Sequence, residues 1–152
     1  MELRTFGGVL RFAMELEASA VELYKNLVSR IGDEDPVTTE LFTKYSREHS
    51  RRHRLLEEIR QRNINEVLLE PISGIESGTY TVNTDASGKM DSAKAINTAA
   101  DAEEKTAGFY EDTYKVGRAA LGEAAIAFKR FQQENRERER ALRSPGCNER
   151  ST

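Results

Sequence analysis

Apolar residues recur at three- and four-residue steps over four long stretches of this chain, which is the spacing of one buried face on an α-helix. The first stretch covers about residues 5–31 and the second about 36–63. The third begins near Asp91 or Ser92, and the fourth ends at Arg143. The pattern therefore predicts an all-α protein with four long helices.

Turn and cap residues separate these stretches. Gly32 follows the first, and Asp35 and Pro36 form a start signal for the second, because an acid caps a helix and proline suits its first turn. Gly117 and Gly122 bracket a predicted tight turn between the third and fourth helices. The predicted domain is 1–143, and 144–152 is predicted to be a flexible tail.

Each predicted helix carries one glutamate within its apolar stripe. A carboxylate is unusual on a buried helical face, so these four positions are the first candidates for chemistry. The expected stripes contain, in chain order, Ala13, Glu17, Val21, Tyr24, Leu27 and Ile31; Leu41, Tyr45, Glu48, Arg52, Leu55 and Ile59; Ile96, Ala99, Glu103, Ala107, Tyr110 and Tyr114; and Ala124, Ala127, Phe131, Glu134, Arg138 and Ala141.

The two halves of the chain are related by an internal repeat. A shift of 86 positions carries Phe42 onto Phe128 and Glu48 onto Glu134. The same shift relates three pairs in the other predicted helices: Ala13 and Ala99, Glu17 and Glu103, and Tyr24 and Tyr110. The repeat predicts a duplicated two-helix unit in which all four glutamates occupy corresponding places.

The repeat also accounts for a long connection at 64–90, which contains Pro71, three glycines and many small polar residues. If two helical hairpins are related by a pseudo-two-fold axis, the second and third helices are parallel. The chain between them must then return along the whole bundle, and about 27 extended residues span the ~37 Å that a 25-residue helix covers. This predicts a four-helix bundle with one crossover connection.

The amino-acid composition further restricts the kind of protein and the partners that it can have. Charged residues make up 32% of the chain and hydrophobic residues 38%, which suits helices around a narrow core. The net charge of −3 gives no basic excess for a nucleic-acid partner, and the run Arg136–Arg143 alternates in sign, as on a solvated helix face. The single cysteine, Cys147, excludes an internal disulfide. Acids interrupt the first apolar stretches, so we expect no signal peptide, no membrane span and a cytoplasmic location.

Four converging carboxylates require compensation, because burying each one unpaired costs several kcal/mol and they repel one another. Metal ions, arginines in the core or bound protons could each supply it. Hard oxygen ligands at this depth suit iron or manganese, with zinc also suitable. In helical bundles, one glutamate per helix with a further ligand one turn later on two helices holds two metals.

These residues resemble the rubrerythrin-like branch of the ferritin-like, di-iron carboxylate superfamily. The resemblance rests on Glu17 with Tyr24, on Glu103 with Tyr110, on the hairpin layout and on the sequence LLEPI after the second helix. It implies a ferritin-like four-helix bundle with two iron ions, a homodimer and an oxidoreductase that reduces peroxide or oxygen or handles iron. The chain has no rubredoxin-like module, so the resemblance implies an external electron donor.

The family pattern is broken at one position in each half. The second and fourth helices of the family carry Glu-x-x-His, but here the matching positions hold Arg51 and Glu137. Glu137 can still bind a metal, so the resemblance implies a metal set of Glu17, Glu48, Glu103, Glu134 and Glu137. Arg51 cannot bind one, because its guanidinium is never deprotonated.

Two interpretations of the function follow. In the first, the chain is a degenerate dimetal protein in which Tyr24 and Tyr110 support the ligands. In the second, it is a metal-free structural or interaction protein, whose glutamates are neutralised by an Arg51–Glu137 pair and neighbouring arginines. His49 and His53 could meet on one metal at their four-residue spacing, but the interpretation we favour is that they are solvated on a basic face.

Overall fold

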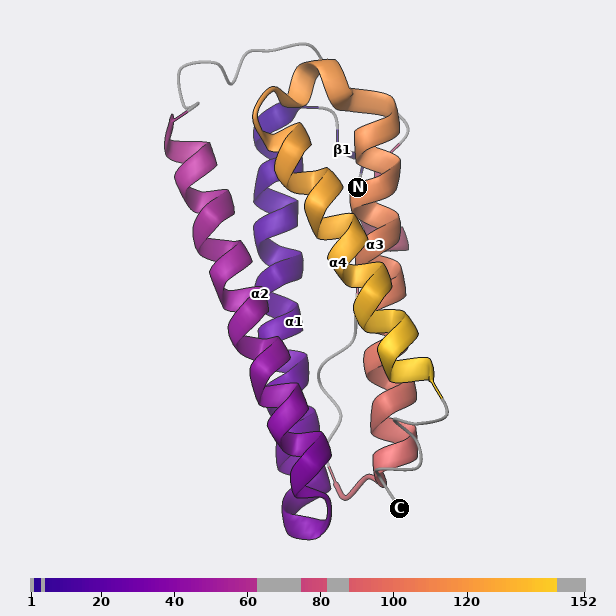
Figure 1. The fold of residues 1–152 in the computed structure, drawn as a ribbon. Coiled ribbons are helices and arrows are strands. Elements are labelled where there is room, and N and C mark those ends of the chain that lie inside the picture. Colours follow the sequence, from indigo (N-terminus) through magenta and orange to yellow (C-terminus); the bar gives the residue numbers. More distant parts are fainter. Residues whose placement is uncertain (1, 4, 63–74, 82–87, 145–152) are drawn as a thin grey trace.

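The structure is a computed structural model that describes residues 2–3, 5–62, 75–81 and 88–144, with the side chains of residues 2, 119 and 120 excepted. Four helices dominate it, as the apolar pattern predicted (Figure 1). They are α1 (Phe6–Ile31), α2 (Pro36–Arg62), α3 (Ser92–Leu121) and α4 (Ala124–Arg143). The all-α prediction is therefore confirmed.

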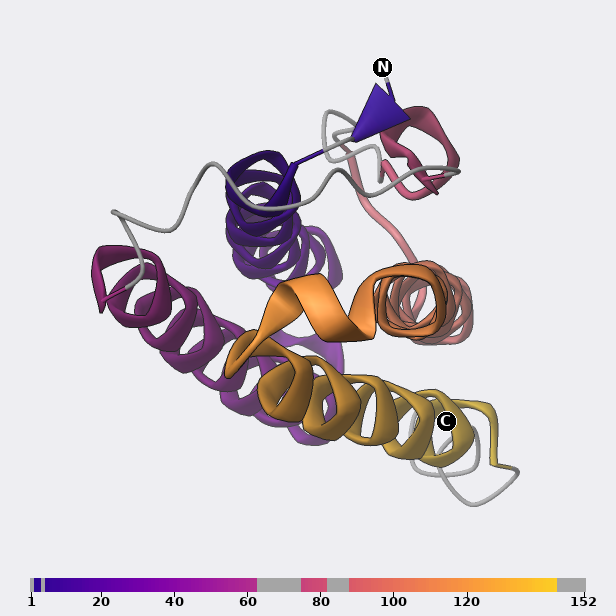
Figure 2. The ribbon, with the colours of Figure 1, turned by 90° about the horizontal axis from the view of Figure 1, so that it is seen from above.

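The helices form two antiparallel pairs. α1 packs against α2 and α3 packs against α4, while α1 also lies beside α3 (Figure 2). α2 and α3 run in the same direction (Figure 1), so the chain must cross the length of the bundle between them. The predicted connection at 64–90 lies mostly outside the described residues. Its described part includes the strand β2 (Ile75–Glu76), which pairs antiparallel with β1 (Glu2–Leu3).

The helix boundaries follow from local capping. Asp35 accepts the backbone N–H of the residue three positions on at 3.1 Å, and Asp91 does the same at the start of α3 at 2.8 Å. Such caps stabilise a helix by about 1 kcal/mol each. Gly32 ends α1 with a φ of 67°, in the left-handed region where glycine is favoured. The predicted start and stop signals at these positions are confirmed.

The turn between α3 and α4 is shorter than expected. The prediction placed a turn between Gly117 and Gly122, but α3 continues to Leu121 with a kink at Gly117, where φ is −130° and ψ is 15°. Only Gly122 and Glu123 separate the two helices, and Gly122 has a φ of 56°. Gly117 itself has non-helical backbone angles, so the chain bends at this glycine, and one further helical turn follows that ends at the fully buried Leu121.

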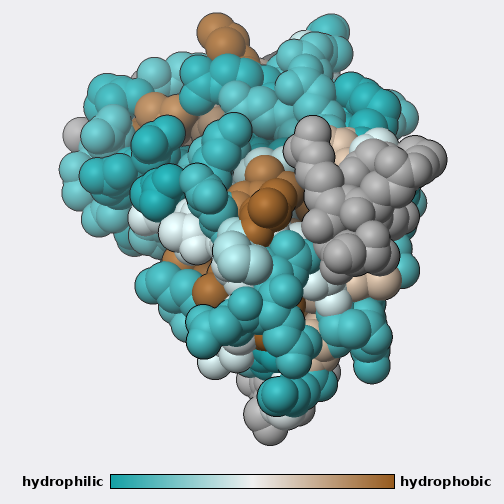
Figure 3. Space-filling view, turned by 60° about the horizontal axis from the view of Figure 1, so that its bottom comes forward, coloured by the Kyte–Doolittle hydropathy of each residue, from teal (hydrophilic) through white to brown (hydrophobic). Residues whose placement is uncertain are grey.

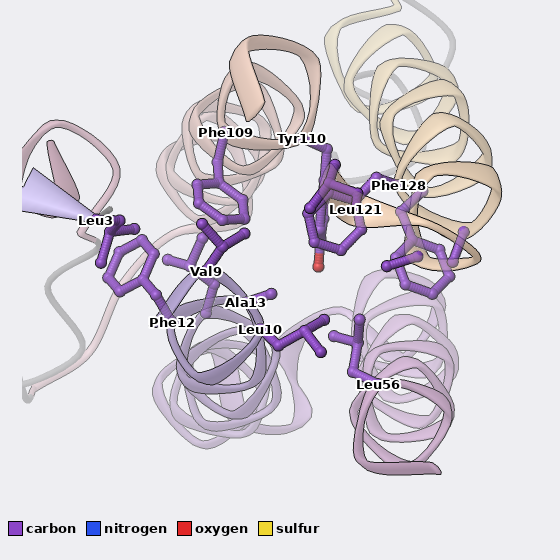
Figure 4. Close-up of a cluster of buried hydrophobic side chains, with 14 of the residues drawn as sticks. Leu3, Val9, Leu10, Phe12, Ala13, Leu56, Phe109, Tyr110, Leu121 and Phe128 are labelled. Atoms are coloured by element: carbon purple, nitrogen blue, oxygen red, sulfur yellow. The ribbon is translucent and has the colours of Figure 1, made fainter. Parts of the chain in front are cut away.

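The apolar core consists of two clusters. One contains Leu10, Leu56, Tyr110 and Phe128, drawn from all four helices (Figure 4). The repeat carries these residues onto members of the second cluster: Ile96, Leu142, Tyr24 and Phe42. The two clusters are thus related by the internal repeat. The bundle also buries a set of polar side chains: Glu17, His49, Arg52, Glu103, Asn135 and Arg138.

The face of the molecule shown in Figure 3 is mostly hydrophilic, and its apolar areas are small and scattered. Among the described residues, the large apolar side chains that are exposed are Val37, Val116 and Ile126. None of the described helices has the length and apolarity needed to cross a membrane.

Candidate functional site: a buried ionic layer

His49 lies at the centre of the buried polar layer and is 1% exposed. Its Nδ1 is 2.5 Å from Oε1 of Glu17, and its Nε2 is 2.8 Å from Oε2 of Glu103. Burial alone would lower the pKa of His49, but the charges of Glu103 and Glu17 raise it above its ordinary value. Since both ring nitrogens face carboxylate oxygens, His49 is held as an imidazolium that donates to both. The expectation of a solvated His49 is therefore wrong, whereas His53 is half-buried.

Glu17 and Glu103 are the two sequence-predicted glutamates that are fully buried, as predicted. Each accepts a hydrogen bond from the tyrosine of the other half. The Tyr24 hydroxyl donates to Oε2 of Glu103 at 2.6 Å, and the Tyr110 hydroxyl donates to Oε2 of Glu17. Burial first, and then the neighbouring carboxylate, raises the pKa of each tyrosine well above its usual value. Both tyrosines therefore stay protonated and serve as fixed donors.

Asn135 is the counterpart of His49 in the repeat and is also fully buried. Its Nδ2 donates to Oε1 of Glu103 at 2.6 Å, and its Oδ1 accepts from Nη1 of Arg52 at 2.8 Å. The amide thus links a buried carboxylate to a buried cation. The predicted stripe of the fourth helix did not include Asn135, since its neighbour Glu134 was taken as the inward residue.

Arg52 is a buried cation whose three guanidinium nitrogens all donate hydrogen bonds. Nη1 lies 3.4 Å from Oε2 of Glu17, and Nη2 donates to the carbonyl of Phe131 at 3.0 Å. Nη2 and Nε both donate to Oε1 of Glu134, at 3.0 and 3.3 Å. The guanidinium also lies 4.6 Å from the centre of the Phe131 ring, a cation–π contact. Arg52 therefore connects the buried layer to the edge of the bundle.

Arg138, the counterpart of Arg52, repeats part of this arrangement. Nε and Nη2 donate to Oε1 of Glu48 at 3.0 and 2.8 Å, and the guanidinium lies 5.5 Å from the Tyr45 ring centre. Nη1, however, is buried without a hydrogen-bond partner among the described residues, 3.6 Å from Oε1 of Glu103.

The repeat explains this unpaired nitrogen. In the other half, the equivalent atom of Arg52 donates to the side-chain oxygen of Asn135. The residue equivalent to Asn135 is His49, whose two nitrogens are both occupied by carboxylates and which offers no acceptor. One substitution between the halves thus gives the layer its central cation and leaves one N–H of Arg138 unpaired.

Glu48 and Glu134 lie at the edge of this layer rather than at its centre. Their side chains are 27% and 40% exposed, and each binds an arginine of the opposite helix. The expectation that all four glutamates point inward is therefore wrong for these two. The inward position one residue later in each helix is taken by His49 and Asn135.

A single signal in the sequence could have corrected the orientation of both helices. The buried residues of α2 include Phe42, His49 and Leu56, and those of α4 include Phe128, Asn135 and Leu142. The phenylalanines and leucines in these two sets are paired by the repeat. They are larger and more apolar than the equivalent pairs in the predicted stripes, which were Leu41 with Ala127 and Leu55 with Ala141.

Arg51 and Glu137, where the repeat departs from the Glu-x-x-His pattern, are both exposed. They line a cleft between α2 and α4, on the side where the pseudo-symmetry places them. They form no ion pair with each other within the described structure, so the expected Arg51–Glu137 pair is not formed. The buried cations that contact the glutamates are His49, Arg52 and Arg138.

The balance of burial and charge keeps the central carboxylates ionised. Burial would raise the pKa of Glu103, but His49, Arg138 and the Tyr24 hydroxyl lower it to about 2. Burial acts in the same way on Glu17, and there the charges of Arg52 and His49 bring its pKa below the ordinary value. The layer is therefore a network of fixed charges, in which three cations face four carboxylates.

Within the described residues, no three His, Cys, Asp or Glu side chains are arranged as ligands for a metal ion. In comparisons with known proteins, no family model, no curated protein and no solved structure matches this chain.

Proposed function

We propose that this chain is a metal-free bundle of ferritin-like type that serves as a structural or binding protein, with an ionic network at the place of a dimetal centre. One observation carries the proposal: the two central carboxylates, Glu17 and Glu103, are bridged by a single imidazolium, His49. A positive charge already lies between the two groups that would otherwise bridge two metal ions.

The side chains around the expected metal ligands support this proposal in two further ways. Both nitrogens of His49 are engaged, so the imidazole has no lone pair for a metal in this arrangement. Arg52, which never loses its proton, lies against both Glu17 and Glu134. As arranged, these side chains do not fit a pair of metal ions, because a guanidinium occupies the space beside two of the expected ligands.

A buried ionic network also has a recognised structural use. Such networks contribute little net stability compared with an apolar core, but they disfavour alternative packings in which a charge is left unpaired. Here, the cross-half contacts from Tyr24 to Glu103 and from Tyr110 to Glu17 require the two hairpins to dock in one register. The network would therefore fix the pairing of the two halves.

The second candidate is the rubrerythrin-like dimetal function implied by the sequence resemblance. One feature favours it: carboxylates from all four helices, together with two tyrosines, lie in or beside one layer of the bundle. In that case Glu17, Glu48, Glu103, Glu134 and Glu137 would hold two iron ions, or manganese or zinc, after His49 and Arg52 moved away. The bound metals would supply electrons to peroxide or oxygen, and a homodimer and an external electron donor would be expected.

Metal analysis separates the two candidates. The full chain is purified from iron-supplemented cells, and Fe, Mn and Zn are measured by inductively coupled plasma mass spectrometry. We expect less than about one tenth of an equivalent of each metal per chain. A functional dimetal site would bind metal tightly enough to keep it through purification, so a content this low would mean that no such site exists. Stoichiometric metal that disappears in the Glu103→Gln variant would overturn the ionic proposal.

Thermal unfolding gives an independent measure. A ligand that binds only the folded state raises the unfolding temperature, so ferrous iron added without oxygen should leave it unchanged if no site exists. The exposed variant Glu104→Gln is the matched control for Glu103→Gln, since it removes a carboxylate from the next position of the same helix.

A further inference from the structure

The cleft between α2 and α4 has a volume of about 630 Å³, within the range of small-molecule sites. Its floor contains Arg52 and Arg138, and Tyr45 and Leu55 also line it. The cleft lies over the ionic layer, and several of its lining residues are paired by the internal repeat. The cleft is therefore open to solvent, and the ionic layer beneath it does not fill it, so it is available to bind a ligand.

The two walls of the cleft differ in charge. The α4 wall carries two cations, Arg130 and Arg138, and two carboxylates, Glu134 and Glu137, so it is neutral. Both of its cations are engaged with glutamates: Arg138 binds Glu48, and Arg130 lies 3.9 Å from Oε2 of Glu134.

The α2 wall carries three cations, Lys44, Arg51 and Arg52, and one carboxylate, Glu48, which gives it a charge of +2. Glu48 accepts hydrogen bonds from Arg138, and Arg52 donates its hydrogen bonds to groups of the buried layer, including Glu134. Lys44 and Arg51 are exposed and have no ion-pair partner within the described structure. Seven positions separate them, so they lie on the same face of α2.

The charge difference between the walls comes from one substitution. The repeat relates Lys44 to Arg130, Glu48 to Glu134 and Arg52 to Arg138, each with conserved charge sign between the halves. It also relates Arg51 to Glu137, and only this pair differs in sign. With a glutamate at position 51, as at the equivalent position 137, both walls would be neutral.

We propose that the α2 wall of this cleft binds a small, doubly charged oxyanion between Lys44 and Arg51. Lys44 and Arg51 are the cleft cations left without a carboxylate partner in the described structure, since Arg52, Arg130 and Arg138 each contact a glutamate. The inference rests on the ionic core proposed above, since Arg52 and Arg138 must stay paired with Glu134 and Glu48 in the layer.

Isothermal titration calorimetry and amide NMR shifts test the proposal, with the full chain at low ionic strength. Inorganic phosphate and malonate are the two probes, and they distinguish a phosphate site from a dicarboxylate site. Arg51→Glu makes the α2 wall match the α4 wall, and we expect it to weaken binding at least about tenfold, because an attraction becomes a repulsion. Arg47→Glu, an equal charge change on an exposed α2 residue that does not line the cleft, should have a small effect.

The reverse change gives a positive test. Glu137→Arg gives the α4 wall a charge of +2, so we expect tighter binding or a second equivalent of the anion. The proposal is overturned if neither probe binds at millimolar concentration, or if Arg47→Glu weakens binding as much as Arg51→Glu does. Metal analysis is unaffected by any of these results, so the failure of this inference and the failure of the proposed function can be told apart.

Discussion

His49 and Asn135 bind the two oxygens of one carboxylate. The Nε2 of His49 lies 2.8 Å from Oε2 of Glu103, and the Nδ2 of Asn135 lies 2.6 Å from its Oε1. The internal repeat relates these two residues, so equivalent positions of the two halves meet on the same group. Because one is a cation and the other a neutral amide, the two halves have the same shape but different electrostatics, and this difference leads to the predictions that follow.

Replacing His49 by Gln should remove the alkaline loss of stability. The pKa of His49 is raised in the folded state, so its stabilising effect is complete below about pH 6.5, its unfolded value, and is lost as the pH rises through the folded pKa. Urea unfolding at pH 6 and pH 9 measures this. Wild type should lose stability between the two values, and His49→Gln should start lower and change little. His53→Gln, the control, should behave as wild type; equal slopes for all three proteins would contradict the assignment.

Glu103 should limit stability on the acid side. Its pKa is about 2 in the folded state, compared with 4.5 ordinarily. The stabilising effect is therefore present above about pH 4.5 and is lost as the pH falls towards 2, which amounts to roughly 3 kcal/mol. Acid unfolding of Glu103→Gln should lack this part of the transition. The exposed neighbour provides the comparison, since Glu104→Gln should keep the wild-type acid profile, and a wild-type profile for Glu103→Gln would rule the explanation out.

The two buried arginines should differ in their importance for folding. Arg52→Met removes the partner of the buried groups Glu17 and Asn135, and breaking such a network typically costs about 3–5 kcal/mol. Arg138→Met should cost clearly less, because among the described residues Arg138 donates hydrogen bonds only to Glu48, which is 27% exposed, and its Nη1 lies 3.6 Å from Glu103 without a hydrogen bond. Denaturant unfolding at pH 6 compares the two variants, and equal losses would show that the unpaired nitrogen of Arg138 has no energetic consequence.

Gly122 should tolerate no side chain without cost. Its φ of 56° with ψ of −128° is strained for any residue with a Cβ, although no atom lies within 4 Å of the Cβ position. Gly122→Ala should therefore destabilise the bundle by about 1–2 kcal/mol through backbone strain alone. Gly78→Ala is matched for space and has no positive φ, so its unfolding temperature should stay near that of wild type. Similar unfolding temperatures for the two variants would show that backbone strain does not cause the loss of stability.

Much of the fold could be predicted from local pattern. Helical periodicity identified four helices, and caps such as Asp35 and Asp91 gave their starts. Most of the predicted buried positions of α1 and α3, including Glu17 and Glu103, were also correct, although Val21 and Tyr114 are only half-buried. These features succeed because they depend on residues only three or four positions apart. The predicted turn between Gly117 and Gly122 was only partly correct, because the chain does kink at Gly117 but forms one more helical turn before Gly122.

The candidate site was predicted only in part. Glu17, Glu103, Tyr24 and Tyr110 do meet in the buried layer, but Glu48 and Glu134 lie at its edge. The error arose because a rotation of α2 and α4 by one position exchanges a glutamate for His49 or Asn135 on the inner face. Both faces are polar at that position, so hydrophobicity alone distinguishes them poorly.

The sequence by itself determined the helices, the duplication and the presence of charge inside the bundle, since each is written in residue spacing. The partners of those charges were decided by the tertiary structure. Tyr24 and Glu103 are 79 positions apart, and Arg52 and Asn135 are 83 apart, and no local pattern specifies that they meet. Their contacts depend on how two hairpins dock and on which side of each helix faces inward, and that orientation is fixed only when the whole core packs together.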